Sequence, residues 1–471
     1  MNIILIGILA YISLQLFIGF YISRFIKSED DYLLGGRRLG FFLTTFSIFA
    51  TWFGAESCIG TAGASYESGL SGVTADPFGY GFVLLLMGFF FSIPLYKRNL
   101  TTIADFFRER FSPSTERLVA LIMIPTSILW AAAQIRAFGL ILSASSGLDI
   151  QLSIFISAII VITYTVFGGL LADAWTDLVQ GFILIIGLII LFIMIFFDGV
   201  NVPIVLQNIA SDKLKIISSS QGFFSLEILS TAEAWAIPIC GSLIAQELVS
   251  RVLAAKSQKV ARTSAIASGF MYIIIGLIPL TIGLIGNQLI SDIQHSEQIL
   301  PLVAQKYLSS VFYVIFTGAL ISAILSTVDS TLLASSALMS HNLIFNYIKP
   351  NDEKIKLKIT RLNVFISGVI AYLLATYAEG VYELVKDASA FGSSGIFVIF
   401  IFGLLSRRGN GISASLSLIT GAISWITSHY ILDIEFAYLI SLLIAFTTFV
   451  MSLLTEKYHQ ELKILFRKIY P

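Results

Sequence analysis

A succession of long apolar segments constrains this chain more than any other feature of its sequence. The hydrocarbon core of a bilayer, about 30 Å thick, needs about 20 apolar residues to cross it as an α-helix. Helices are expected because lipid offers no hydrogen-bond partner to an unpaired backbone group. The sequence therefore predicts an all-α integral membrane protein with about thirteen transmembrane helices. Their approximate bounds are 3–23, 41–66, 77–96, 118–144, 150–170, 175–197, 231–253, 264–290, 309–340, 360–378, 387–405, 411–430 and 436–455.

Composition supports this class and excludes others. Hydrophobic residues make up 56% of the 471 residues and charged residues only 12%, whereas soluble domains carry about 25% charged residues. Lysine plus arginine and aspartate plus glutamate balance at 29 each, which gives no sign of a nucleic-acid partner. We find no nucleophile motif and no phosphate-binding glycine loop, so the chain is predicted to be neither an enzyme nor an ATP-driven pump.

Basic residues gather in the segments that would face the cytoplasm if the N-terminus lay outside the cell. Positive charge in short loops marks the cytoplasmic side of a membrane protein. The exceptions are Arg136, Lys213, Lys215, Lys306 and Lys386. The pattern predicts a multi-pass protein of the cell membrane, with its N-terminus outside and its C-terminus in the cytoplasm.

Two spans contain residues that weaken a helix. The second carries Gly54, Gly60 and Gly63, and the seventh carries Pro238 and Gly241. In transporters, paired broken helices mark the solute and ion site near the middle of the membrane. The alternative is that these are packing glycines and an ordinary proline kink.

The interrupted spans occupy matching places in the chain. Each begins a group of five spans, 41–197 and 231–405, and the groups start on opposite sides of the membrane, which predicts an inverted repeat. We expect 1–40 to hold the first helix and an inner loop, 198–230 to form an extracellular loop, and 406–471 to hold two last helices and a cytoplasmic tail.

The ninth span carries a polar stripe. Ser322, Ser326 and Asp329 fall on one helical face, with Ser330 beside them. Hydroxyl groups alone favour helix packing or bonds to carbonyls of their own helix. A carboxylate inside the membrane instead indicates a functional site, and oxygen ligands suit a hard cation such as sodium.

Several motifs resemble the sodium/solute symporter family over nearly the full length of the chain. They are Asp31 to Gly40, Gly168 to Leu170 with Trp175 to Asp177 and Gln180, Gln246 to Arg251 with Ala254 to Ser257, and Ala323 to Ser330. The resemblance implies the leucine-transporter-type 5+5 inverted-repeat fold with two broken helices. It also implies sodium as the coupling ion.

The resemblance further implies which residues bind the ion. The common sodium site of the family corresponds to the carbonyl groups of Ala50, Phe53 and Ala323 with the hydroxyl groups of Ser326 and Thr327. Some members hold a second sodium ion, at positions that here correspond to Asp177, Asp329 and Ser330. Because an acid replaces one hydroxyl, this second site is expected to bind either a cation or a proton. We interpret the nearby Asp173 as a solvated loop charge.

Aromatic and polar residues inside the spans form the candidate solute site. These are Trp52, Glu56, Trp130, Gln134 and Trp235. Aromatic faces attract cations and can cage a quaternary ammonium group, and Glu56 would add a counter-charge. The alternative is that tryptophans belong to the interfacial belts, which fits Trp175 better than Trp52 or Trp130.

Within the family, the chain looks most like the branch that contains the high-affinity choline transporter, although Glu56 departs from that branch. The expected function is sodium-coupled import of a small cationic amine or quaternary ammonium compound, choline-like or polyamine-like. If Arg136 binds a carboxylate rather than reaching the outer interface, the solute is zwitterionic, such as proline or betaine, and a sugar is a further alternative. A solute sensor acting through a partner protein is the alternative of another class.

Overall fold

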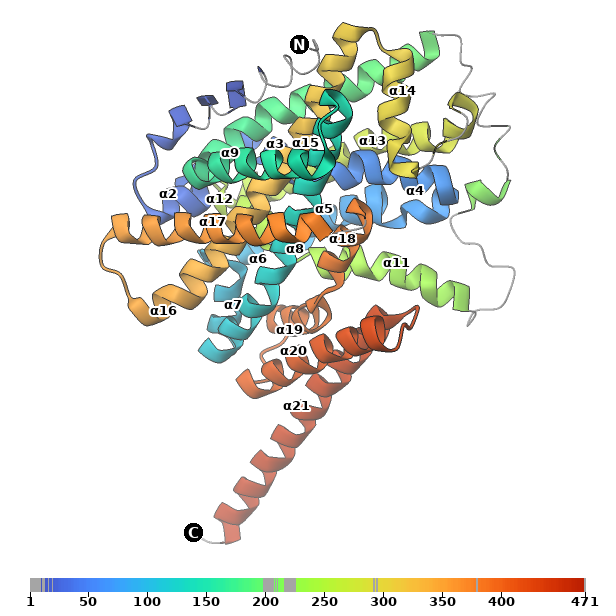
Figure 1. Cartoon of the computed structure of the whole chain (residues 1–471). Helices are drawn as coiled ribbons and strands as arrows, with labels where there is room; N and C mark the ends of the chain where they lie inside the picture. The colour runs from blue at the N-terminus through green and yellow to red at the C-terminus, as the bar shows by residue number, and fades with distance from the viewer. Residues whose placement is uncertain are drawn as a thin grey trace.

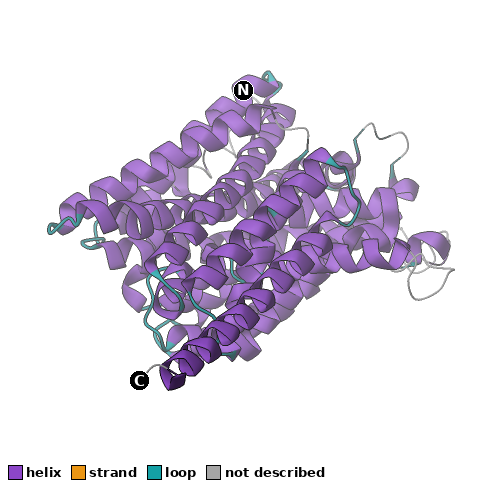
Figure 2. Cartoon of the chain, turned by 90° about the horizontal axis from the view of Figure 1, so that it is seen from below, coloured by secondary structure: helices purple, strands orange, loops and turns teal. Residues whose placement is uncertain are grey.

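The computed structural model describes residue 10 and residues 13–15, 17–18, 20–197, 207, 209, 211–215, 226–290, 293, 295–377 and 380–469. Within these residues the backbone forms helices joined by short loops, with no β-strand (Figure 2). The all-helical prediction is therefore confirmed. Most of the first predicted span, 3–23, and most of the loop 198–230 lie outside the described residues.

The helices follow one another along the chain, and Figure 1 labels the α-helices; in the text, η denotes a short 3-10 or π-helical turn. The first half holds α2 (Glu29–Leu34), η1 (Gly35–Arg37), α3 (Phe41–Trp52), η2 (Glu56–Gly60), α4 (Thr61–Ser68), η3 (Gly69–Val73), η4 (Thr74–Gly79), α5 (Tyr80–Leu86), η5 (Met87–Phe91), α6 (Ser92–Tyr96), α7 (Ile103–Arg110), α8 (Pro113–Ser146), α9 (Ile150–Phe197) and η6 (Ser211–Leu214). The second half holds α11 (Leu226–Ser242), α12 (Gln246–Ala254), α13 (Gln258–Leu289), η7 (Ser296–Gln298), α14 (Ile299–Tyr307), α15 (Ser310–Ala337), η8 (Leu338–Ile344), α16 (Phe345–Ile348), α17 (Glu353–Tyr377), α18 (Val381–Ala390), α19 (Ser393–Leu405), α20 (Gly411–Ile426), η9 (Thr427–Ile431) and α21 (Ala437–Ile469).

Among the described residues, 8 helices are long and apolar enough to cross a membrane, or up to 10 if each of two bent pairs forms one crossing. Two of these helical stretches exceed the length that one crossing needs. α9 has 48 residues and leaves helical geometry at Gly169, at the end of the predicted span 150–170 and before the predicted span 175–197. The stretch Glu56–Tyr96 has 41 residues and leaves helical geometry at Asp76. The total of thirteen spans stays a prediction.

The bent pairs mark further interruptions. α11 and α12 meet at 46°, and α18 and α19 meet at 43°. The first bend was expected near Pro238 and Gly241, but it follows Ser242, because Pro238 is accommodated inside α11. The second bend was not expected: the sequence predicted one span over 387–405. Gly392, with φ of 64°, takes the left-handed backbone that this turn needs.

α15 lies in the middle of the bundle, in contact with α3, α8 and α9 (Figure 1). Every side chain of α15 from Phe316 to Ala337 is buried. A helix enclosed on all sides does not meet lipid, so its polar side chains face other helices. This position makes α15 the element around which a site can be built.

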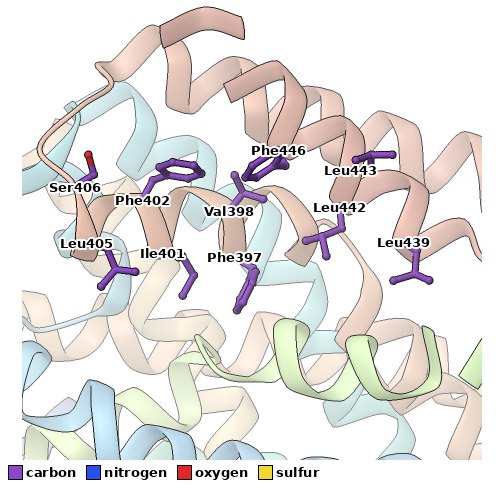
Figure 3. A pocket seen from close by; sticks show the side chains of 10 residues that line it. All are labelled: Phe397, Val398, Ile401, Phe402, Leu405, Ser406, Leu439, Leu442, Leu443 and Phe446. Carbon is purple, nitrogen blue, oxygen red and sulfur yellow. The ribbon is translucent and has the colours of Figure 1, made fainter. Parts of the chain in front are cut away.

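The last helices pack together at the periphery, and Figure 1 shows α21 extending away from the rest of the chain. Between α19 and α21 runs an apolar groove, drawn in Figure 3. Its lining residues are Phe397, Val398, Ile401, Phe402, Leu405, Ser406, Leu439, Leu442, Leu443 and Phe446. A charged solute would find no counter-charge there, so its site must lie elsewhere.

Replacing Gly169 by alanine should destabilise the turn inside α9. The φ of 59° and ψ of 175° at Gly169 belong to a region that side chains rarely occupy, and an added Cβ would lie 2.7 Å from Cδ2 and 3.0 Å from the carbonyl oxygen of Tyr32. We expect Gly169→Ala to lose about 1–3 kcal/mol of unfolding free energy, measured by unfolding of purified protein in detergent. Gly168→Ala is the control, because its Cβ would meet only Ala172 Cβ at 3.5 Å; equal losses would contradict the prediction.

Candidate functional site

The break in the second predicted span lies at Phe53 and Gly54. α3 ends at Trp52, Phe53 takes a non-helical backbone with φ of −93° and ψ of 71°, and the chain becomes helical again at Ala55. Carbonyl groups at the end of α3 are thereby released from the helical hydrogen-bond pattern. In a membrane such groups need another partner.

α15 packs against this break and supplies hydroxyl groups. Ser326 Oγ donates to the carbonyl oxygen of Ala50 at 2.6 Å and also lies 3.0 Å from that of Ala323. Thr327 Oγ1 donates to the same Ala323 carbonyl at 3.0 Å. All these residues and Phe53 are at most 1% exposed. The structure thus brings together the oxygen atoms that the family resemblance assigns to sodium.

The residues of the expected second cation site also come together. Ser330 Oγ lies 3.1 Å from Thr51 Oγ1 on α3 and donates to the carbonyl oxygen of Ser326 at 2.6 Å. Asp177 accepts a 2.6 Å hydrogen bond from Ser47, which joins α9 to α3. Asp329 accepts from the backbone amide of Ser330 at 3.1 Å. Both acids are buried.

A buried arginine completes this second cluster. The basic-residue pattern predicts that Arg251 on α12 faces the cytoplasm. The side chain is instead only 1% exposed. Its guanidinium group contacts Asp173 and Ser330 and lies 3.9 Å from the carboxylate of Asp177. The interpretation of Asp173 as a solvated loop charge is wrong, since it is 2% exposed and paired with Arg251. The pair could not be seen in the sequence, because Arg251 and Asp173 come together only when α12 and α9 both pack against α3 and α15.

Aromatic rings gather on the other side of the break. The ring centroids of Trp52 and Trp130 are 5.4 Å apart, and Tyr80 lies 5.6 Å from the first and 6.1 Å from the second. The indole N–H groups of both tryptophans are buried; in the described part of the chain that of Trp52 has no hydrogen-bond partner, whereas that of Trp130 lies against the Glu56 carboxylate. Tyr80 was not expected here. These three residues are called the aromatic trio below.

Gln134 lies one turn from Trp130 on α8 and links this helix to the break in α3. Its Nε2 donates to Glu56 Oε2 at 2.6 Å, and its Oε1 accepts from the backbone amide of Ala55 at 3.1 Å. Glu56 is 1% exposed. The expected neighbours Trp52, Trp130, Gln134 and Glu56 therefore share one buried region.

A second carboxylate near the break escaped the sequence analysis. Asp76 in η4 is fully buried and accepts hydrogen bonds from Ser57 at 2.7 Å and from Tyr272 at 2.8 Å. Its Oδ1 atom completes no hydrogen bond within the described residues, although Thr61 also interacts with the group. In the sequence, Asp76 directly precedes Pro77, the first residue of the predicted span 77–96, and an acid at the membrane interface is ordinary. The only sign of a buried site was therefore an acid at the edge of a span. Folding instead buries η4 against η2 and α13.

Two candidate residues lie apart from this group. Trp235 on α11 is partly buried, and among the described residues it forms no ring contact with the aromatic trio. Arg136 donates to the carbonyl oxygen of Ala375 on α17 at 3.3 Å. That contact engages one nitrogen of the guanidinium group on α17, and the choice between a solute carboxylate and the outer interface as the partner of Arg136 stays a prediction.

The sequence and fold match known transporters. The family model described as "Sodium:solute symporter family" matches residues 32–421, which is most of the chain. The chain belongs to the sodium:solute symporter family. Membership makes this symporter a transporter rather than an enzyme, embeds it in a membrane by multiple spans, and identifies sodium as its coupling ion. The predicted family and coupling ion are therefore confirmed.

Relatives and solved structures agree with this assignment. The symporter is 28% identical to human "High affinity choline transporter 1" over 412 residues, covering 81% of this chain and 69% of the relative. It is 28% identical to the "Osmoregulated proline transporter OpuE" of Bacillus subtilis, covering 90% and 89%. It spans between 59% and 69% of the length of the choline transporters that it matches.

The solved structure of a sodium-coupled sialic acid symporter matches with a TM-score of 0.82 at 20% identity, covering 96% of this chain and 98% of that one. A nucleobase-cation symporter in a closed conformation matches with a TM-score of 0.61. At these identities the likeness shows the fold alone, which confirms the predicted fold class.

Removing the buried guanidinium group should destabilise the symporter. Arg251→Ala would leave Asp173 and Asp177 buried without this cation, and breaking a buried pair costs roughly 3–5 kcal/mol. We expect a lower melting temperature in detergent. Arg262→Ala is the control, because Arg262 is exposed on the next helix. Similar melting temperatures for the two variants would contradict a structural role for Arg251.

Proposed function

We propose that this symporter imports a small organic cation, an amine or quaternary ammonium compound, by alternating access driven by sodium. The observation that carries the proposal is the pair of buried carboxylates at the break in α3: Glu56, which Gln134 links to the helix of Trp130, and Asp76, which accepts a hydrogen bond from Ser57. Within the described residues, no lysine, arginine or histidine forms an ion pair with either acid.

The charge of the site supports a cationic solute. A buried carboxylate without a counter-ion is costly in a medium of low polarity, so this region favours ligands that bring positive charge. The faces of Trp52, Tyr80 and Trp130 attract the same ligands through their ring quadrupoles. We infer that Trp52, Trp130, Gln134 and Glu56 contact the solute, with Trp235 at the edge of the site and Asp76 as a second counter-charge.

We propose that the coupling ion binds between α3 and α15. The carbonyl groups of Ala50, Phe53 and Ala323 and the hydroxyl groups of Ser326 and Thr327 would be its ligands. Their supporting geometry is the contact of Ser326 with Ala50 across the two helices, together with full burial. An ion there would replace these hydrogen bonds and hold the interrupted α3 against α15, and its release toward the cytoplasm would let the helices part.

Asp177, Asp329 and Ser330 remain our candidates for a second cation or a proton. Arg251 already brings one positive charge to this cluster, which contains three acids with Asp173. One fixed charge does not neutralise three carboxylates, so a further proton or cation is expected there. We propose the two five-span groups 41–197 and 231–405 as the repeats that move against each other, and an orientation with the N-terminus outside.

A zwitterionic solute is less well supported, because Arg136 is engaged with the α17 carbonyl of Ala375. A sugar would leave Glu56 and Asp76 without opposite charge. Solute flux into proteoliposomes distinguishes a symporter from a solute sensor. The reconstituted protein should accumulate solute when a sodium gradient is imposed, whereas a sensor would bind the solute without accumulating it.

Removing both hydroxyl groups of the ion site should weaken sodium coupling. We expect Ser326→Ala with Thr327→Ala to raise the sodium concentration for half-maximal uptake by roughly tenfold or more, since two oxygen ligands are lost. Uptake into proteoliposomes at varied sodium measures this change. Ser335→Ala is the control, because its buried hydroxyl bonds Leu332 within α15 and lies outside the proposed site. Unchanged sodium dependence in the double variant would contradict the ion assignment.

The solute class can be tested by ligand stabilisation. A ligand that binds only the folded protein raises its melting temperature. We expect small amines and quaternary ammonium compounds to do so in the presence of sodium, and Trp130→Leu to abolish the rise. Proline, betaine and neutral sugars form the comparison set, and stabilisation by those compounds alone would refute a cationic solute.

A further inference from the structure

Glu56 lies beside the proposed ion site as well as beside the aromatic trio. Gly54 stands between the carboxylate and α15: a Cβ added there would meet Glu56 Oε2 at 2.6 Å, Glu56 Oε1 at 3.0 Å and Thr327 Oγ1 at 2.7 Å. Because the Glu56 carboxylate and the Thr327 hydroxyl both lie within 3.0 Å of this one position, they are also close to each other. The absence of a side chain at Gly54 therefore opens a direct line between the Glu56 carboxylate and a hydroxyl group of the ion site.

The carboxylate has an oxygen atom available for an additional ligand. Oε2 accepts the hydrogen bond from Gln134, whereas Oε1 is buried and completes none within the described residues, although the Trp130 indole lies against the group. Burying a charged oxygen in this way is unfavourable unless a cation approaches it. Among the ligands of this site, the ion beside Thr327 is the cation that Glu56 can reach through the gap at Gly54.

The two central carboxylates have different surroundings. Asp76 is held by Ser57 and Tyr272, on the side of η2 that faces α13. No described contact joins Asp76 to Ser326 or Thr327, whose hydrogen bonds go to Ala50 and Ala323. One carboxylate thus adjoins α15 and its hydroxyl groups, and the other adjoins α13.

We propose that Glu56, while it still borders the solute site through Gln134, is a charged ligand of the coupling sodium ion, and that Asp76 then supplies the main counter-charge for the solute. The inference rests on the proposed function, because it needs a sodium ion between α3 and α15. The five other ligands of that site are uncharged carbonyl and hydroxyl oxygens. A carboxylate adds Coulomb attraction that is strong in a buried environment. Since Gln134 and Glu56 are hydrogen-bonded, the ion and the solute site also share one polar link.

This arrangement gives a physical cause for coupling. Without sodium, Glu56 is a second uncompensated charge next to the aromatic trio, and a solute cation can be drawn to it in the wrong position. With sodium bound, Glu56 is neutralised and fixed against α15, so that the solute pairs with Asp76. The order in which the ion binds first and the solute second follows from these charges.

The decisive experiment measures sodium binding without any solute. Purified protein in detergent is titrated with sodium chloride against potassium chloride at equal ionic strength, and the rise in melting temperature gives the half-saturating sodium concentration. We expect Glu56→Gln to raise this concentration by roughly tenfold or more. Asp76→Asn, which removes an equally buried charge that acts on Glu56 only through space, should raise it by much less than Glu56→Gln does, because no described hydrogen bond joins Asp76 to Ser326 or Thr327.

The outcomes distinguish a failure of the proposed sodium site from a failure of the role of Glu56 in that site. If wild-type protein is stabilised no better by sodium than by potassium, the proposed sodium site itself fails. If wild-type protein responds to sodium and Glu56→Gln responds at the same concentration, only the role of Glu56 is overturned. Should Glu56→Gln not fold, Glu56→Asp takes its place: a side chain shorter by one methylene should also weaken sodium binding, and an unchanged response would again refute the proposal.

Discussion

The contact between α15 and the interrupted end of α3 governs the rest of this structure. α3 stops at Trp52, and a carbonyl group that its own helix no longer satisfies is met by Ser326. Lipid supplies no water to such groups, so they must be satisfied by a neighbouring helix or by an ion. This requirement explains why α15 is buried on every side from Phe316 to Ala337 and why its polar residues face α3 and α9.

Buried charge is distributed between two places that differ in one respect. In one part of the polar core, Asp173 and Asp177 lie close to Arg251, a cation provided by the chain itself. At the break in α3, Glu56 and Asp76 have hydrogen-bond donors but no basic residue among the described neighbours. The first cluster therefore carries part of its own neutralisation, while the second depends on cations that arrive from outside. We expect this difference if the Arg251 cluster stabilises the fold and the Glu56 and Asp76 region binds transported cations, because both lie in the same low-dielectric interior.

The features that were predictable from sequence depend on local patterns. Apolar length predicted a helical protein that crosses the membrane several times, and glycine content located the break at Gly54. Helical spacing placed Ser326 and Asp329 on the buried face of the ninth span. The features that were missed depend on which helix packs beside which. Asp76 and Arg251 sit near span ends in the sequence, where charge is ordinary, and only their burial by η2, α13 and α9 reveals them. The bend at Gly392 was missed because a single glycine does not by itself announce its left-handed backbone.

Sequence by itself determined that this protein lies in a membrane, that it is helical and that the ninth span carries a polar stripe, because hydrophobic length and helical periodicity are properties of neighbouring residues. Tertiary structure decided which carboxylates meet which partners. Glu56 lies near Thr327 only because α15 packs across Gly54, and Asp173 meets Arg251 only because α12 and α9 both pack against α15. Electrostatic interactions in a buried interior depend on distances of a few ångströms between segments far apart in the chain, and those distances exist only in the folded protein.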